Sequence, residues 1–138
     1  MTTAPATDLR LHYALFGDLL ATALAPHSVY KFGEVPGFDG NPGTTPTMYA
    51  LVDVQRRSYL PQKLGGRAGK SLWAVSVRGV GSTVSEVAWL LDRATDALEE
   101  KRITLDGHGS TLLTFDTHDP IEPDGGDFSG LVAFTYSL

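Results

Sequence analysis

Near the N-terminus, apolar residues recur at the three- and four-residue spacing of a helix. The pattern predicts a helix from Leu9 to about Leu24, with Asp8 as its N-cap and Pro26 beyond its end. The apolar arc is wider than a surface helix needs. The helix is therefore either buried between the sheet and a loop or shared between its own core and a neighbouring subunit. Two adjacent stripes make up the arc: Leu9, Tyr13, Phe16, Leu20 and Leu24, and beside them Leu11, Leu15 and Leu19.

Alternation of the side chains predicts two strands, Met48–Arg57 and Ser71–Arg78, which form a long hairpin around the loop Ser58–Lys70. A shorter strand is expected over His27–Phe32. Between it and the hairpin lies Gly33–Thr47, a Gly- and Pro-rich connection of a length that is usually functional or mobile in compact domains. On the first strand the residues expected to share one face are Met48, Ala50, Val52 and Val54, and on the second strand those expected to face together are Trp73, Val75 and Val77.

A second helix begins at a capping box in which Thr83 is the N-cap and Glu86 the third helical residue. We expect it to end near Glu100. Trp89 falls on the polar side of this helix, where a large aromatic ring must be covered by something. The cover is either a loop of the same chain or another subunit. The apolar face is predicted to comprise Val84, Val87, Ala88, Leu91, Ala94, Thr95 and Leu98.

Three further strands are expected, over Ile103–Leu105, Thr111–Phe115 and Ser129–Leu138, with an acidic loop, Asp116–Asp127, before the last one. The order of elements predicts an α+β fold, a mostly antiparallel β-sheet with a long hairpin, flanked by two main α-helices. Its length of 138 residues fits a single domain, residues 1–138, with residues 1–7 expected to be flexible.

The composition narrows the functional classes. The chain has no cysteine, which excludes a disulfide scaffold, a cysteine-based zinc site and a thiol nucleophile. The net charge of −5 disfavours a protein that grips nucleic acid through its phosphates, but suits a channel through which DNA passes without specific binding. We see no signal peptide and no apolar stretch long enough to span a membrane, so no membrane association is expected.

No catalytic, metal or cofactor motif stands out. The segment 65–71 looks like a phosphate-binding loop, but Leu64 stands where its first glycine belongs and a strand follows instead of a helix. His118 with Asp116 and Asp119 offers possible cation ligands, although a solvated acidic segment explains them more simply. We therefore expect no enzyme activity, no metal and no cofactor.

Separation of charge is the most informative feature of the sequence. Basic residues gather in and around the hairpin, while the segment Asp116–Asp127 carries acids and no Lys or Arg. If the two groups lie on different sides, head-to-tail packing of copies would bring opposite charges together. Alternatively, both are simply solvated loops. The candidate interface residues are Arg56, Arg57, Lys63, Arg67, Lys70, Trp89, Asp116, Asp119, Glu122, Asp124 and Asp127.

The chain resembles the tail-terminator (tail-completion) proteins of long-tailed bacteriophages over nearly its whole length. The likeness lies in the order of the first helix, the hairpin and the later strands. It also lies in a Val75-x-Val77 strand followed by a helix with the pattern A-x-x-L-x-x-A-x-x-x-L, which begins at Ala88 and ends at Leu98.

The resemblance implies a structural virion protein in the tail-neck region, assembled in the host cytoplasm. It implies a homo-oligomer, a hexameric ring, that terminates the tail tube and joins it to the head-completion or neck protein. Hairpin residues Arg56–Lys70 and the loop Gly33–Thr47 would then lie at interfaces. The alternatives are a head-tail stopper or other neck protein, a small ligand-binding domain with a cleft beside Gly33–Thr47, and a metal enzyme using His118.

Overall fold

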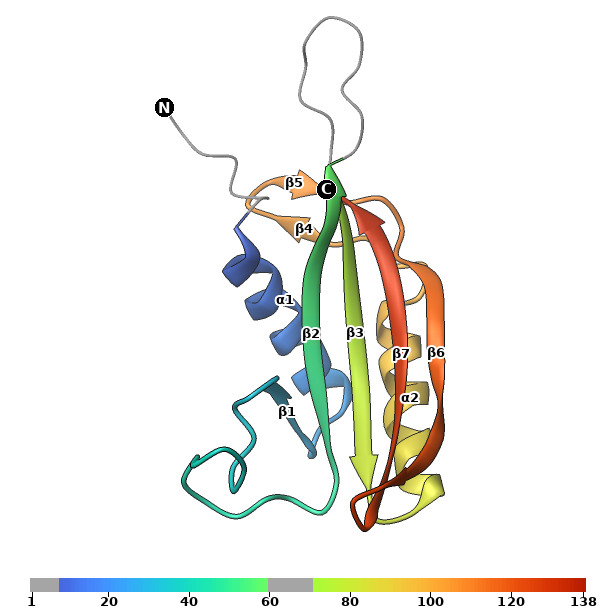
Figure 1. Ribbon diagram of the computed structural model, residues 1–138. Helices are drawn as coiled ribbons and strands as arrows, with labels where there is room; N and C mark the ends of the chain where they lie inside the picture. Colours follow the sequence, from blue (N-terminus) through green and yellow to red (C-terminus); the bar gives the residue numbers. More distant parts are fainter. Residues whose placement is uncertain (1–7, 60–70) are drawn as a thin grey trace, which may run out of the picture.

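The computed structural model describes residues 8–59 and 71–138, and its elements form two layers, a five-stranded sheet with both helices behind it (Figure 1). The predicted loop tip with Lys63, Arg67 and Lys70, and the predicted flexible residues 1–7, lie outside the described residues. The elements are α1 (Leu9–Ala23), β1 (Ser28–Lys31), β2 (Tyr49–Tyr59), β3 (Ser71–Gly81), α2 (Val84–Leu98), β4 (Thr104–Leu105), β5 (His108–Gly109), β6 (Thr114–Asp124) and β7 (Asp127–Ser137).

The main sheet has the strand order β1-β2-β3-β7-β6. Only β1 pairs with its neighbour in parallel, and the other three pairings are antiparallel. A small separate ladder joins β4 to β5. The prediction of a mostly antiparallel α+β fold with two flanking helices is confirmed, and β2 and β3 pair along their length as the predicted hairpin strands.

α1 begins where the sequence predicts. The carboxylate of Asp8 accepts a hydrogen bond from the backbone N–H of Arg10 at 3.0 Å, which satisfies one free donor of the first turn. The buried face is narrower than the predicted arc. It consists of His12, Phe16 and Leu20, continued by Leu24, whereas Leu9, Leu11 and Leu19 are exposed.

α2 has the predicted capping box, with Thr83 and Glu86 each bonded to the other's backbone N–H. Its buried face is rotated about the helix axis from the predicted one: Val84 is 49% exposed and Leu90 is fully buried. Gly79 on β3 explains this rotation, because a Cβ at Gly79 would lie 3.2 Å from the Leu90 Cβ. A strand glycine thus lets the helix approach closely through Leu90.

The prediction of an acidic loop over Asp116–Asp127 is wrong, because most of this segment is strand β6, paired with β7. Its polar sequence and its two prolines, Pro120 and Pro123, hide the strand. Both features are tolerated because β6 is an edge strand, hydrogen-bonded on one side only. The pairing is irregular between Phe115 and Thr117 and again between Asp119 and Glu122, as expected for an edge that breaks regular alternation.

The core lies between the helices and the inner face of β2, β3 and β7. Trp73, Val75 and Val77 face together from β3, as predicted, and all are almost completely buried. The alternation predicted for β2 also holds, with Val52 and Val54 in this core. The helices therefore cover one face of the sheet, and no described helix covers the other face.

Candidate interaction surface

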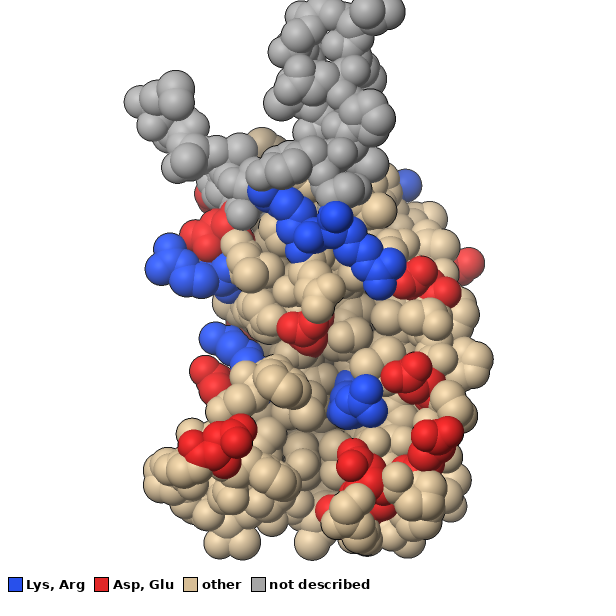
Figure 2. Space-filling view, in the orientation of Figure 1, with Lys and Arg blue, Asp and Glu red and all other residues tan. Residues whose placement is uncertain are grey.

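The second face of the sheet has no described helix over it, and it is the face toward the viewer in Figures 1 and 2. Leu51 of β2, Ser76 and Arg78 of β3 and Leu131 of β7 are partly exposed here and line shallow hollows. In Figure 2 basic side chains gather at the upper end of this face, and acidic ones follow the right side and the lower end.

Arg78 lies at the centre of a polar network on this open face. Its guanidinium donates to Ser129 Oγ at 3.3 Å and lies 3.5 Å from a carboxylate oxygen of Asp119. The Ser129 hydroxyl in turn donates to Asp124 at 3.0 Å. The network joins β3, β7 and β6 by side chains as well as by backbone, and it holds the guanidinium of Arg78 among carboxylates.

The connection predicted over Gly33–Thr47 is a structured loop held by its own hydrogen bonds. The side-chain amide of Asn41 donates to the carbonyl oxygens of Gly33, at 2.8 Å, and Val35, at 3.1 Å. The Thr45 hydroxyl donates to the carbonyl of Pro36 at 2.6 Å. These bonds fix the loop in a compact form. Its anchor on the open face is a second small cluster of buried residues: Val35, Tyr49 and Val80.

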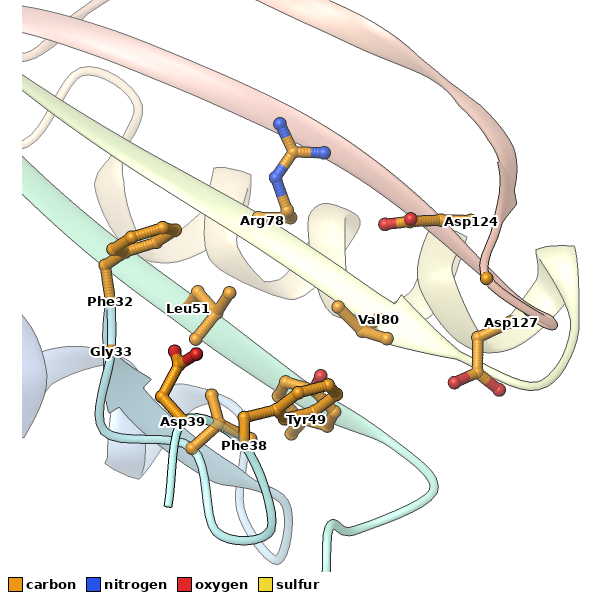
Figure 3. Close-up of a pocket in the computed structure, with 12 residues that line it drawn as sticks. Phe32, Gly33, Phe38, Asp39, Tyr49, Leu51, Arg78, Val80, Asp124 and Asp127 are labelled. Atoms are coloured by element: carbon orange, nitrogen blue, oxygen red, sulfur yellow. The ribbon is translucent and has the colours of Figure 1, made fainter. Parts of the chain in front are cut away.

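A groove of about 410 Å³ lies between this loop and the β6–β7 turn (Figure 3). We call it the acidic groove. Phe32 and Phe38, on the loop side, are 80% and 49% exposed and form an aromatic rim. Asp124 and Asp127 stand on the opposite side, at the turn. The other lining residues are Gly33, Val35, Asp39, Tyr49, Leu51, Arg78, Val80 and Gly125.

The groove combines apolar lining with a negative field. Burial raises the pKa of the Tyr49 hydroxyl, and the nearby charges of Asp127 and Asp124 raise it further. An aromatic rim next to carboxylates suits a ligand with an apolar anchor and a positive charge. A groove thus lies beside Gly33–Thr47, at the place where the ligand-binding alternative puts its cleft.

The predicted charge separation is partly wrong. Arg57 on β2 and Asp116 on β6 form an ion pair at 3.0 Å, so the two groups meet at one end of the open face. The reason is that the acidic segment is a strand running the length of the sheet edge, with only its far end, Asp124 and Asp127, near the groove. Glu122 is exposed on the same strand.

Arg56 and Trp89 both lie against aromatic rings or cations of their own chain. The guanidinium of Arg56 lies 5.0 Å from the centre of the Trp73 ring. The rings of Trp89 and His27 form a T-shaped pair with centres 5.3 Å apart, and the guanidinium of Arg93 lies 4.9 Å from the Trp89 ring centre. The chain thus supplies part of the cover that Trp89 needs, and the ring remains partly exposed.

The buried polar contacts of His12 could not be recognised from the sequence. His12 is completely buried, stacks on Trp73 with ring centres 3.7 Å apart, and lies 2.6 Å from the Tyr136 hydroxyl oxygen. Burial raises the pKa of Tyr136. The spacing of His12 from Phe16 and Leu20 would have placed it on the buried stripe, but its partner on the last strand could not be read from the sequence.

The alternative of a metal site at His118, Asp116 and Asp119 does not match the structure. Within residues 8–59 and 71–138, no three His, Asp or Glu side chains come together as metal ligands, so His118, Asp116 and Asp119 do not converge. His118 lies against the ring of Phe115 instead.

Among the described helices, none is both long and apolar enough to cross a membrane.

Comparison with known proteins shows a shared fold. The sequence matches no protein-family model and no curated protein. A solved chain described as "Virion of native gene transfer agent (GTA) particle" superposes with a TM-score of 0.63 at 18% identity, covering 99% of this chain and 97% of that one. A second solved chain, which carries no functional description, superposes with a TM-score of 0.62 at 15% identity over 95% of each chain.

Proposed function

We propose that this chain is a structural virion protein that oligomerises into a ring, closes the phage tail tube and joins it to the head-neck connector. The observation that carries the proposal is the fold shared, end to end, with a chain of a gene transfer agent virion. The shared fold spans all but a few residues of both chains. The tail-terminator pattern in the sequence supports the same role.

The exposed apolar face of α1 supports a role in assembly. Leu11 and Leu19 lie two helical turns apart and are 36% and 38% exposed, with Leu15 partly exposed between them. Leu15 packs partly against the chain's own core, but the stripe as a whole is left partly uncovered, which suits burial against another protein. The proposed partners are further copies of this chain, in a hexamer, together with the tail-tube protein and a head-completion or neck protein.

The charge of the chain also fits a channel component. The net charge is −5, and the open sheet face carries its acids along one edge and at its lower end. Repulsion of phosphates by such a surface would let DNA pass without specific binding. The proposed location is the tail-neck region of the virion, with assembly in the host cytoplasm and no catalytic step. A head-tail stopper or another neck protein is the neighbouring role.

A small ligand-binding domain is the second candidate, and the acidic groove is the observation that favours it. The two candidates make different predictions. A ligand-binding domain would stay a monomer or dimer and unfold at a higher temperature when its small molecule is bound. A terminator would form discrete rings and bind the end of a tail tube.

The test is incubation of the purified protein with tail tubes, followed by electron microscopy. The proposal expects rings capping one end of the tubes. Two candidate interface residues test the site: Arg67→Glu and Trp89→Ala should lower ring formation and tail joining. Asp92→Asn, an exposed helix position outside the candidate set, serves as control. The proposed interface fails if both variants join tails as well as the unchanged protein, and the proposed role fails if the unchanged protein never binds tubes.

A further inference from the structure

We propose that the acidic groove is a docking site for residues 60–70 of a second copy of this chain. The inference rests on the proposed self-assembly and names the contact through which copies join. Four features carry it: the groove's carboxylates, its apolar lining, the composition of residues 60–70, and the distance along the sheet between the groove and the strand ends that flank this segment.

The carboxylates give the groove the negative charge that would attract the basic residues of the segment 60–70. Asp39 lines the groove from the loop, and Asp124 and Asp127 line it from the β6–β7 turn (Figure 3). Asp124 already accepts a hydrogen bond from Ser129. Arg78 also lines the groove, but it is held against Asp119 and Ser129, and the three carboxylates leave the lining net negative. A positive group that entered the groove would meet carboxylates on both sides, next to aromatic rings that attract cations.

The apolar lining supplies the anchor. Phe32 and Phe38 stand exposed at the rim, and Leu51 is only partly covered, so the groove leaves apolar surface uncovered in the free chain. Its volume of about 410 Å³ holds a few side chains, which is the scale of a peptide contact and too small for a whole helix. Exposed aromatic residues of this kind are frequent energetic centres of protein interfaces.

The composition of residues 60–70 matches both properties. Leu60 and Leu64 offer apolar anchors, and Lys63, Arg67 and Lys70 carry positive charge with no acid among them. With Arg56 and Arg57, this stretch of 15 residues holds five of the chain's 11 Lys and Arg residues. Its charge therefore complements that of the groove.

The points where residues 60–70 join the described sheet make the contact one between copies. The chain leaves β2 and re-enters β3 at the upper end of the sheet, whereas the groove lies at the lower end, beside the β6–β7 turn (Figure 1). The ends of β2 and β3 that flank residues 60–70 lie at the end of the sheet away from the groove, so docking of this segment on a second copy would be a head-to-tail contact, which leads to closed rings or to stacked copies.

A synthetic peptide of residues 60–70 tests the contact directly. The receptor is the full chain with Lys63→Ser, Arg67→Ser and Lys70→Ser, which removes competition from its own segment. Binding is followed by fluorescence anisotropy at low salt, and backbone NMR shifts locate the peptide. We expect shifts at Phe32, Phe38 and Asp127, and loss of binding when the three basic residues of the peptide are replaced by Glu.

Two matched receptor variants sharpen the test. Asp39→Asn with Asp127→Asn should weaken peptide binding by about three- to tenfold, because each partly exposed ion pair contributes modestly. Asp92→Asn with Asp96→Asn changes the net charge equally on exposed positions of α2 and should leave binding unchanged. Absence of binding, equal loss in both variants, or shifts confined to another surface would overturn the inference. Rings that form without peptide binding would overturn the docking contact alone, and peptide binding without any ring would count against the proposed role instead.

Discussion

The guanidinium of Arg57 on β2 lies 3.0 Å from the carboxylate of Asp116 on β6, although β3 and β7 separate the two strands in the sheet. The pair therefore lies across the upper part of the open face. It also explains why the two charge groups of the sequence are not opposite poles. The basic group meets the start of the acidic strand, and only the end of that strand reaches the acidic groove.

This ion pair should contribute little to the stability of the free chain. Both side chains are partly exposed, so water screens their attraction. In a double-mutant cycle with Arg57→Gln and Asp116→Asn, we expect a coupling energy below about 1 kcal/mol, measured by urea unfolding. A coupling of several kcal/mol would mean that the pair is part of the core stability.

The buried hydrogen bond between His12 and Tyr136 should matter more. The two atoms are 2.6 Å apart in the interior, where a lost hydrogen bond is not replaced by water. We expect Tyr136→Phe to lower the free energy of unfolding by about 1–3 kcal/mol. Urea unfolding followed by tryptophan fluorescence measures this, since Trp73 stacks on His12. A variant as stable as the unchanged protein would contradict it.

Because α2 lies close to β3, we expect Gly81 not to tolerate a larger side chain. A Cβ at Gly81 would lie 2.9 Å from the Glu86 Cβ, so Gly81→Ala must push the capping box away from the strand. We expect a loss of about 1–3 kcal/mol in the free energy of unfolding. Gly109→Ala is the matched control, because nothing lies within 4 Å of a Cβ there. Equal melting temperatures for the two variants would refute this packing.

Much of the fold could be predicted because local chemistry specifies it. Asp8 and the pair Thr83 and Glu86 are helix caps with a defined geometry, and alternation on β2 and β3 sets which residues enter the core. β6 could not be predicted, because an edge strand with one partner needs no apolar alternation and tolerates prolines.

The candidate site was harder to predict than the fold. The acidic groove forms from Phe32 and Phe38 on a loop, Tyr49 and Val80 on two strands, and Asp127 on a distant turn. Nothing in the sequence brings these segments together. The loop's importance could be expected from its length, but its compact form depends on hydrogen bonds of Asn41 and Thr45 that only the folded chain shows.

The exposed leucines of α1 should affect assembly without affecting folding. Leu11→Lys and Leu19→Lys each replace a side chain that is already partly in water, so we expect changes in stability within about 0.5 kcal/mol. Ring formation should fall sharply. Leu20→Ala, one position along and fully buried, should instead lower the free energy of unfolding by about 2–5 kcal/mol. Lysine variants that assemble normally would exclude this stripe from the interface.

The mass of the purified protein in solution tests the central proposal most directly. Native mass spectrometry or light scattering over a wide range of concentrations, with and without tail tubes, distinguishes a ring from smaller species. We predict a discrete hexamer, either free or at the end of a tube. A chain that stays monomeric at every concentration and does not bind tubes would contradict it.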